Sequence, residues 1–217
     1  FINAMTAIRH LTLLLTAVFL ISSPLLAGDK SPAPTNIRPE GKPGVIKPER
    51  QTESHTCGLH SMRALYKSYQ LPVDEYNLRV RIGVDKPTVP FVNSTMGSIH
   101  PDLLRVLDQD GFKYEVVDMK NDNVHLKLAN HLKSEHYAMI LLKLNNGIMH
   151  WVVVSDEKDD RYTIVDSLKK EPHKLSQSSI DKQLIGVVLI EPQPSEGPGM
   201  GKSLRTGLWE GLKSLFR

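Results

Sequence analysis

Residues 51–69 read QTESHTCGLHSMRALYKSY and carry the most information in the chain. From Cys57 onward the apolar residues recur at the spacing of one helix face, at Leu59, Met62, Leu65, Tyr66 and Tyr69. The segment therefore predicts an amphipathic helix over 57–69 that begins at the cysteine and buries one face.

Cys57 is the only cysteine among 217 residues, which excludes an intramolecular disulfide and a four-cysteine zinc site. At a helix start, its sulfur faces free backbone amides and the positive end of the helix dipole, which favour the nucleophilic thiolate. Gly58 leaves room for a substrate, and the Gln51 side chain with the Cys57 backbone amide would form an oxyanion hole. We expect Cys57 to be a catalytic nucleophile, and the alternative is a buried structural cysteine.

A base for this thiol is expected in a hairpin formed by residues 148–155 and 161–166. With its turn centred on Lys158, three pairs share one face of the sheet: Val154–Tyr162, Val152–Ile164 and His150–Asp166. A carboxylate beside a histidine orients the ring and stabilises the imidazolium, as in a catalytic triad. A register slip of one residue would separate His150 from Asp166.

The remaining pattern mixes helices with strands. Further helices are expected over 98–110, with Gly111 as the stop, and over 124–132. The other strands are expected over 113–117, 137–144 and 185–190. Helices come first and an antiparallel meander later, so the fold class is α+β, with the cysteine-bearing helix packed on an antiparallel sheet.

Composition divides the chain into five segments. Residues 1–27 hold a charged start, an apolar block, a Ser-Ser-Pro break and a small residue, which is the order of an export signal peptide. Residues 28–50 are proline-rich and predict an extended leader. A globular domain is expected over 51–191, then a linker over 192–201 and a helix over 202–217. These features predict an exported bacterial protein, periplasmic or secreted.

Both ends leave alternatives open. Residues 11–27 approach the apolar length that crosses a bilayer, so an uncleaved membrane anchor is the alternative to a cleaved signal. The segment Lys202–Arg217 places leucines at helical spacing beside basic residues, which suits docking on an anionic membrane or a partner protein. Packing of this helix on its own domain is the other possibility.

Several ligand classes are not expected. A formal net charge of +3 is too small to indicate nucleic acid binding. Gly-Lys-Ser at 201–203 suggests a phosphate loop, but the pattern requires a glycine where Glu196 stands, so we expect no nucleotide. His55, Cys57 and His60 are possible zinc ligands, yet their spacing is poor and no fourth ligand is evident. We therefore expect no metal and no cofactor.

Four features form one pattern: Gln51-x5-Cys57-Gly58 before an amphipathic helix, His150 before a valine-rich strand, Asp166-Ser167 after the next strand, and Gly97–Leu104 with Gly111-Phe112. This pattern, spanning about Gln51 to Ile190, resembles the double-glycine leader peptidases. These are papain-like cysteine peptidases that process bacteriocin precursors.

The resemblance implies that Cys57 is the nucleophile, His150 the general base and acid, Asp166 the orienting carboxylate and Gln51 an oxyanion donor. Members often show Asp-Pro where this chain has Asp166-Ser167. The well-known members are N-terminal domains of ABC exporters, whereas this chain is expected to be a stand-alone exported form. Double-glycine specificity is therefore not carried over.

These features together predict an exported cysteine peptidase that cleaves a peptide or protein through a thioester acyl-enzyme. Two alternatives stay open. One is an acyltransferase, in which an amine replaces the attacking water. The other is a non-catalytic periplasmic binding or assembly protein that retains the papain-like fold.

Overall fold

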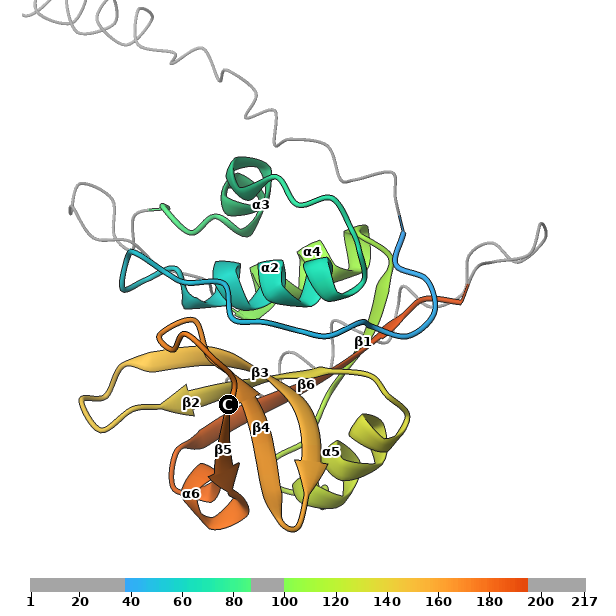
Figure 1. Ribbon diagram of the computed structural model, residues 1–217. Coiled ribbons are helices and arrows are strands. Elements are labelled where there is room, and N and C mark those ends of the chain that lie inside the picture. The colour runs from blue at the N-terminus through green and yellow to red at the C-terminus, as the bar shows by residue number, and fades with distance from the viewer. Residues whose placement is uncertain (1–37, 87–99, 195–217) are drawn as a thin grey trace, which may run out of the picture. The chain divides into compact units, whose positions relative to one another are not determined.

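The computed structural model describes residues 38–86 and 100–194 (Figure 1). The expected signal peptide over 1–27 and the expected helix over 202–217 lie outside these residues, as does most of the expected linker over 192–201. Within the described ranges, no helix is both long enough and apolar enough to span a membrane.

Five helices and six strands are described. The helices are α2 (Cys57–Ser68), α3 (Glu75–Ile82), α4 (His100–Gln109), α5 (Val124–Lys133) and α6 (Gln177–Asp181). The strands are β1 (Phe112–Val116), β2 (Ala138–Lys143), β3 (Met149–Lys158), β4 (Arg161–Val165), β5 (His173–Ser176) and β6 (Leu184–Pro192). All strand pairs are antiparallel, in the order β1-β6-β2-β3-β4-β5. The expected α+β class is confirmed.

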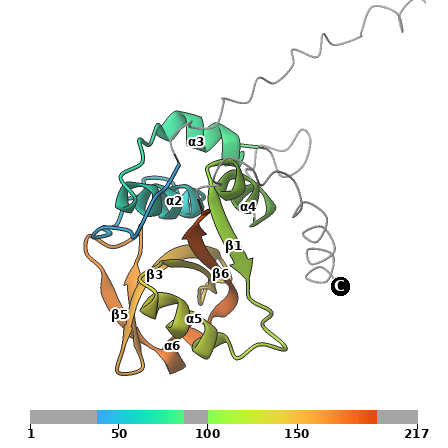
Figure 2. The same cartoon turned by 90° about the vertical axis from the view of Figure 1, so that its right-hand side faces the viewer.

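The sheet separates two helical layers. Helices α2, α3 and α4 cover one face, and α5 and α6 lie on the other (Figures 1 and 2). Alternate residues of β3 enter different cores: Trp151 and Val153 pack beneath α2, whereas Val152 and Val154 pack with Leu128 of α5. This alternation explains the near-continuous valine run of β3, because a strand buried on both faces is apolar throughout.

Helix α3 was not expected, although its ends carry clear signals. The Asp74 carboxylate accepts hydrogen bonds from the Tyr76 and Asn77 amides and caps the first turn. Gly83 ends the helix at φ +73°. The apolar periodicity is weak, since the only buried apolar side chains of α3 are Leu78 and Ile82. Strand β5 and helix α6 were also missed, because four or five residues show too little periodicity.

The register expected for the β3–β4 hairpin is wrong by two or more residues. Val154 pairs with Ile164, where Tyr162 was expected. The turn lies at Asp159 and Asp160, both at φ +55°, as a two-residue type I′ turn requires, and a bulge follows Val154. Near His150 the observed register differs from the expected one by two residues. Because side chains alternate between the two faces of a strand, a shift by an even number leaves each side chain on the expected face. The four apolar residues expected on one face therefore still share one core.

Packed structure begins before Gln51, where the start of the domain was expected. Residues 38–50 form no helix or strand, but Ile46 is 5% exposed within the core beneath α2. The Gly44 carbonyl accepts a hydrogen bond from the Tyr137 hydroxyl at 2.8 Å. At the other end, the Gln193 amide donates to the Gly111 carbonyl, so packed structure also continues past residue 191.

One buried ion pair joins the three helices of the first layer. Asp110, which follows α4, accepts hydrogen bonds from Arg81 of α3 at 2.7 and 3.0 Å and from the Tyr66 hydroxyl of α2 at 2.8 Å. Arg81 also donates to Gln109. Both charged side chains are almost fully buried. A buried ion pair of this kind fixes the relative positions of the helices that it joins more than it adds net stability. Removing one partner is costly because the other charge stays buried.

We predict that Asp110→Ala lowers the free energy of unfolding by about 3 kcal/mol or more, because it leaves the Arg81 charge unpaired. The matched control is Lys113→Ala, which breaks an exposed pair with Glu191 and should change stability by less than about 1 kcal/mol. Urea denaturation measures both. Equal effects would contradict the assignment of Asp110 as a structural centre.

Candidate active site

Cys57 is the first residue of α2, as expected, and is 6% exposed. Thr56 precedes it, but its hydroxyl and amide both donate to the Glu53 carbonyl, at 2.8 and 3.2 Å. The Thr56 side chain therefore turns away from the helix and does not cap it. The first amides of a helix have no partner within it, and at this helix start no side chain caps them, so they favour a negative charge there.

His150 lies on β3 and is brought to Cys57 by the packing of α2 on that strand. Ser61, one turn after Cys57, donates a buried hydrogen bond of 3.0 Å to the carbonyl of Trp151, the neighbour of His150. The Cys57 thiol lies close enough to the His150 imidazole to be among the groups that raise the pKa of the ring. Residues i and i+4 share a helix face, so Ser61 and Cys57 face the strand together.

Asp166 holds the other side of the imidazole. Its Oδ1 accepts from His150 Nε2 at 2.7 Å and from the Leu168 amide at 2.8 Å. Because Nε2 faces the carboxylate, Nδ1 is the nitrogen left for the thiol. The expected contact between His150 and Asp166 therefore exists, even though the last paired residues are Val153 and Val165 and Asp166 follows the end of β4.

The charges of this cluster support one another. Burial favours neutral His150, but the hydrogen bonds and negative charges of Asp166 and Cys57 outweigh it and raise the His150 pKa to about 9. Burial also opposes ionisation of Asp166, yet hydrogen bonds from His150 and Leu168 keep its pKa below the usual value. The pKa of His150 in the folded protein is therefore higher than the value of about 6.5 in the unfolded chain. Protonated His150 stabilises the fold fully below pH 6.5, and this contribution disappears as the pH rises through 9.

Gln51 lies beside the same cluster. Its side-chain amide donates to the Glu53 carbonyl at 3.1 Å, the acceptor that Thr56 also uses. Its backbone amide donates to the carbonyl of Ser167, the residue after Asp166. Gly58 is buried in the first turn of α2. The oxyanion role of Gln51 and the substrate-approach role of Gly58 stay predictions.

Two neighbouring residues were missed from the sequence. Ser61 and Ser167 are both buried and both form hydrogen bonds next to the cluster. Ser61 had one available signal, its position four residues after Cys57 on the same helix face. Ser167 stands in the Asp166-Ser167 pair of the sequence pattern, but nothing in the local sequence indicates its bond to Gln51.

The zinc site considered from the sequence is not formed by the described residues. Only one described group of three potential ligands is close enough for a metal, namely Glu53, His55 and Asp85. Arg79 already donates to both carboxylates, at 2.6 to 3.0 Å. The guanidinium occupies the place that a cation would take, so this group is a satisfied ion-pair network.

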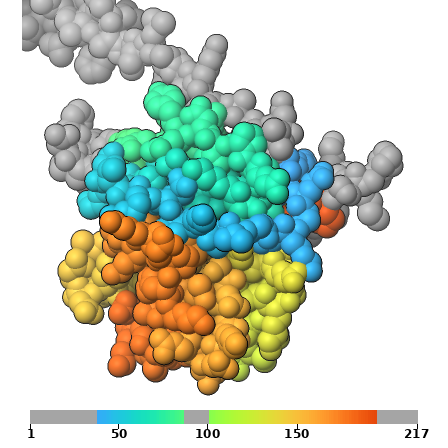
Figure 3. All heavy atoms as spheres, viewed as in Figure 1, coloured from blue at the N-terminus to red at the C-terminus, as the bar shows by residue number. Residues whose placement is uncertain are grey.

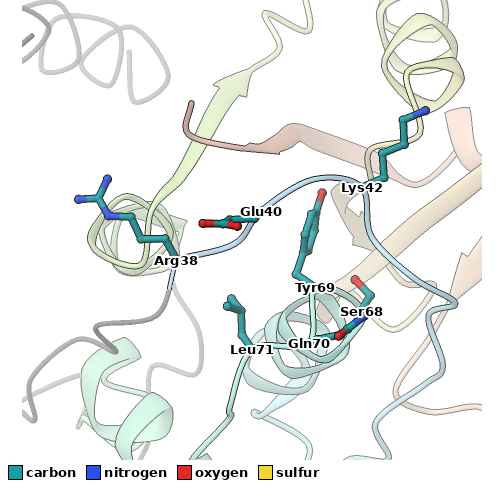
Figure 4. Close-up of a pocket in the computed structure, with 7 residues that line it drawn as sticks. All are labelled: Arg38, Glu40, Lys42, Ser68, Tyr69, Gln70 and Leu71. Atoms are coloured by element: carbon teal, nitrogen blue, oxygen red, sulfur yellow. The ribbon is translucent and has the colours of Figure 1, made fainter. Parts of the chain in front are cut away.

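A cavity of about 530 Å³ lies at the far end of α2. Its lining residues are Arg38, Glu40, Lys42, Ser68, Tyr69, Gln70 and Leu71 (Figure 4). It contains none of the expected site residues, so it is separate from the Cys57 cluster. In Figure 3, the segment that leads into α2 meets the segment that follows β4, at the boundary where the cluster is built.

A thiol at a helix start, an imidazole on the facing strand and a carboxylate behind it make up the site of a papain-like cysteine peptidase. The sequence profile of the Peptidase C39 family matches residues 46–196, more than half of the chain. The chain therefore belongs to the peptidase C39 family. The expectation of a cysteine peptidase with a papain-like fold is confirmed at this level.

Solved structures show the same fold. A double-glycine-motif protease from an AMS/PCAT transporter, in complex with the leader peptide, is 21% identical, with a TM-score of 0.52 over 72% of this chain and 99% of that one. The peptidase domain of Streptococcus ComA, a bifunctional ABC transporter of a quorum-sensing pathway, is 16% identical, with a TM-score of 0.55 over 69% of this chain and 100% of that one. No curated protein matches the sequence significantly.

We predict that iodoacetamide alkylates Cys57 rapidly at about pH 6, and that His150→Ala slows this labelling about tenfold or more, because an unassisted thiol with a pKa near 8.5 is almost entirely protonated there. One cysteine in the chain makes the label unambiguous. The control is His125→Ala, whose ring bonds Tyr162 and Asp181 instead. Wild-type labelling that rises only near pH 8.5 would contradict an activated thiol.

Proposed function

We propose that this chain is an exported cysteine peptidase that hydrolyses a peptide or protein through a Cys57–His150–Asp166 triad. The observation that carries the proposal is the buried bond of 2.7 Å between His150 and Asp166 beside the thiol of Cys57, with His150 at 4% and Asp166 at 8% exposure. A structural cysteine would have no need of a buried histidine and a buried carboxylate in series, since both are costly to desolvate.

Each member of the triad then has a defined step. The Cys57 thiolate attacks the peptide carbonyl carbon, and the oxyanion is held by the Cys57 backbone amide and the Gln51 side chain. The His150 imidazolium gives its proton to the leaving amine as the C–N bond breaks, which leaves a thioester. Water, deprotonated by His150, attacks the thioester and releases the acid and the thiol. Asp166 keeps the ring oriented and stabilises its charged form.

Two observations support a peptide as the substrate. The double-glycine-motif protease with the same fold was solved with a leader peptide bound. In this chain Met149 and Leu168, which adjoin His150 and Ser167 in sequence, are 47% and 46% exposed. Exposed apolar side chains at a site suit a ligand with apolar groups, so we propose a peptide with apolar residues near the cleaved bond.

We predict that the chain cleaves members of a fluorogenic peptide library and that Cys57→Ala abolishes cleavage while peptide binding survives. In wild type, kcat/KM should fall above a pH of about 9, because the imidazolium that protonates the leaving amine is lost there. Asp166→Asn should move this alkaline limit by at least about one pH unit to lower pH, since burial remains while the stabilising carboxylate charge is removed.

The outcomes separate the alternative functions. Equal binding and no turnover in both wild type and Cys57→Ala would indicate a binding protein. A product that carries an added amine in place of water, detected by mass spectrometry, would indicate an acyltransferase. An alkaline limit that is unchanged in Asp166→Asn would contradict the triad.

Export is the part of the proposal that rests on the sequence of residues 1–27 alone. Fusing these residues to an alkaline phosphatase that is active only after export should give periplasmic activity in a bacterial host. Replacing Leu13 and Leu14 by arginine should abolish this activity, because a charge interrupts the apolar block. Activity that persists with both arginines would contradict a signal peptide.

A further inference from the structure

The side-chain amide of Gln51 is held at both of its polar atoms. Nε2 donates to the Glu53 carbonyl at 3.1 Å, and Oε1 accepts from the Ser167 hydroxyl at 2.5 Å. A carbonyl only accepts, so Glu53 selects the amide orientation in which nitrogen faces it. The Ser167 hydroxyl anchors the other end of the amide by donating to Oε1. The amide is therefore fixed in one of its two flipped states.

Ser167 is rigidly placed for this task. It is 3% exposed and directly follows Asp166. Its carbonyl accepts from the Gln51 backbone amide at 3.2 Å, and the Leu168 carbonyl accepts from Arg50 at 2.7 Å. Three hydrogen bonds thus join residues 50–51 to residues 167–168, so the segment that carries the triad carboxylate also positions Gln51.

The Gln51 amide nitrogen has two N–H groups, and the Glu53 carbonyl uses one. The second is the group that an oxyanion would need. Loss of the Ser167 hydroxyl would leave Oε1 without this donor and the amide held by the Glu53 carbonyl alone, so the broad torsion of a glutamine amide would let it turn about that contact. A displaced amide no longer directs its second N–H at the oxyanion.

We propose that Ser167 is a positioning residue whose hydroxyl fixes the orientation of the Gln51 amide, so that one Nε2–H stays directed to the oxyanion formed at Cys57. The catalytic part of this inference rests on the proposed peptidase function. The positioning part rests only on the contacts of Gln51 and Ser167.

The test compares Ser167→Ala, Ser167→Thr and Gln51→Ala on one cleavable peptide. Ser167→Ala should lower kcat about tenfold with KM unchanged, because oxyanion contacts act mainly in the transition state. Ser167→Thr, which keeps the hydroxyl, should restore most of this loss. Gln51→Ala should lower kcat about a hundredfold, and the double variant should be no slower, since one effect acts through the other.

Two measurements exclude a general disturbance of the site. Alkylation of Cys57 by iodoacetamide forms no oxyanion, so its rate should be unchanged in Ser167→Ala. The matched control is Ser68→Ala, which removes another buried serine hydroxyl, bonded to Leu65 at the opposite end of α2. Its kcat should equal that of wild type.

The positioning claim also has a readout that needs no turnover. In nuclear magnetic resonance spectra, the Gln51 side-chain amide protons should exchange slowly with solvent in wild type and faster in Ser167→Ala. Unchanged exchange would overturn the proposal even if the peptidase is active. Slower alkylation in Ser167→Ala, or additive losses in the double variant, would overturn it as well. Changed exchange without peptide cleavage would retain the positioning and reject the peptidase.

Discussion

Cys57 and the imidazole that we propose as its base belong to different layers of the molecule, so the site depends on how α2 packs on β3. The buried hydrogen bond from Ser61 to the Trp151 carbonyl sets this contact, one helical turn from Cys57 and one residue from His150. Close-packed side chains around it, including Leu65 and Val153, resist sliding of the helix along the strand. A sulfur and an imidazole from distant segments are thereby held close enough to interact.

The described residues include two buried pairs of a base and a carboxylate, Arg81–Asp110 and His150–Asp166, and their surroundings differ. Asp110 also accepts from Tyr66, and Arg81 also donates to Gln109, so this pair is bonded to side chains of three helices. His150 and Asp166 are also buried, at 4% and 8% exposure, and the histidine interacts with a thiol as well. Desolvation strengthens both pairs, but only the second can pass a proton to another group.

The loop before α2 is organised around a single backbone acceptor. The Glu53 carbonyl receives the Gln51 side chain together with the amide and hydroxyl of Thr56. The Gln51 amide nitrogen and the Thr56 hydroxyl are thus bonded within the loop, and no side chain caps the first amides of the helix. These amides stay available to negative charge at Cys57, which is what an anionic nucleophile and an oxyanion both require.

The sequence by itself determined the features that depend on local periodicity and local chemistry. These include the start of α2 at Cys57, the helices near 100–109 and 124–133, and the strands that alternate between two cores. Helix α3 and the short β5 and α6 were not determined, because few of their side chains are apolar and buried. The hairpin register depends on the positive φ angles of Asp159 and Asp160 and on the bulge after Val154. The conformational strain of these features is offset by packing across the whole sheet.

Apart from the contact of His150 with Asp166, only the tertiary structure decided which polar groups meet. The pairing of His150 with Asp166 was expected from the sequence and survived a wrong register because the shift next to it was even. The contacts of Ser61 with Trp151 and of Gln51 with Ser167 join residues 90 and 116 positions apart. Serine hydroxyls form such bonds wherever burial places an acceptor, so no pattern along the chain predicts them.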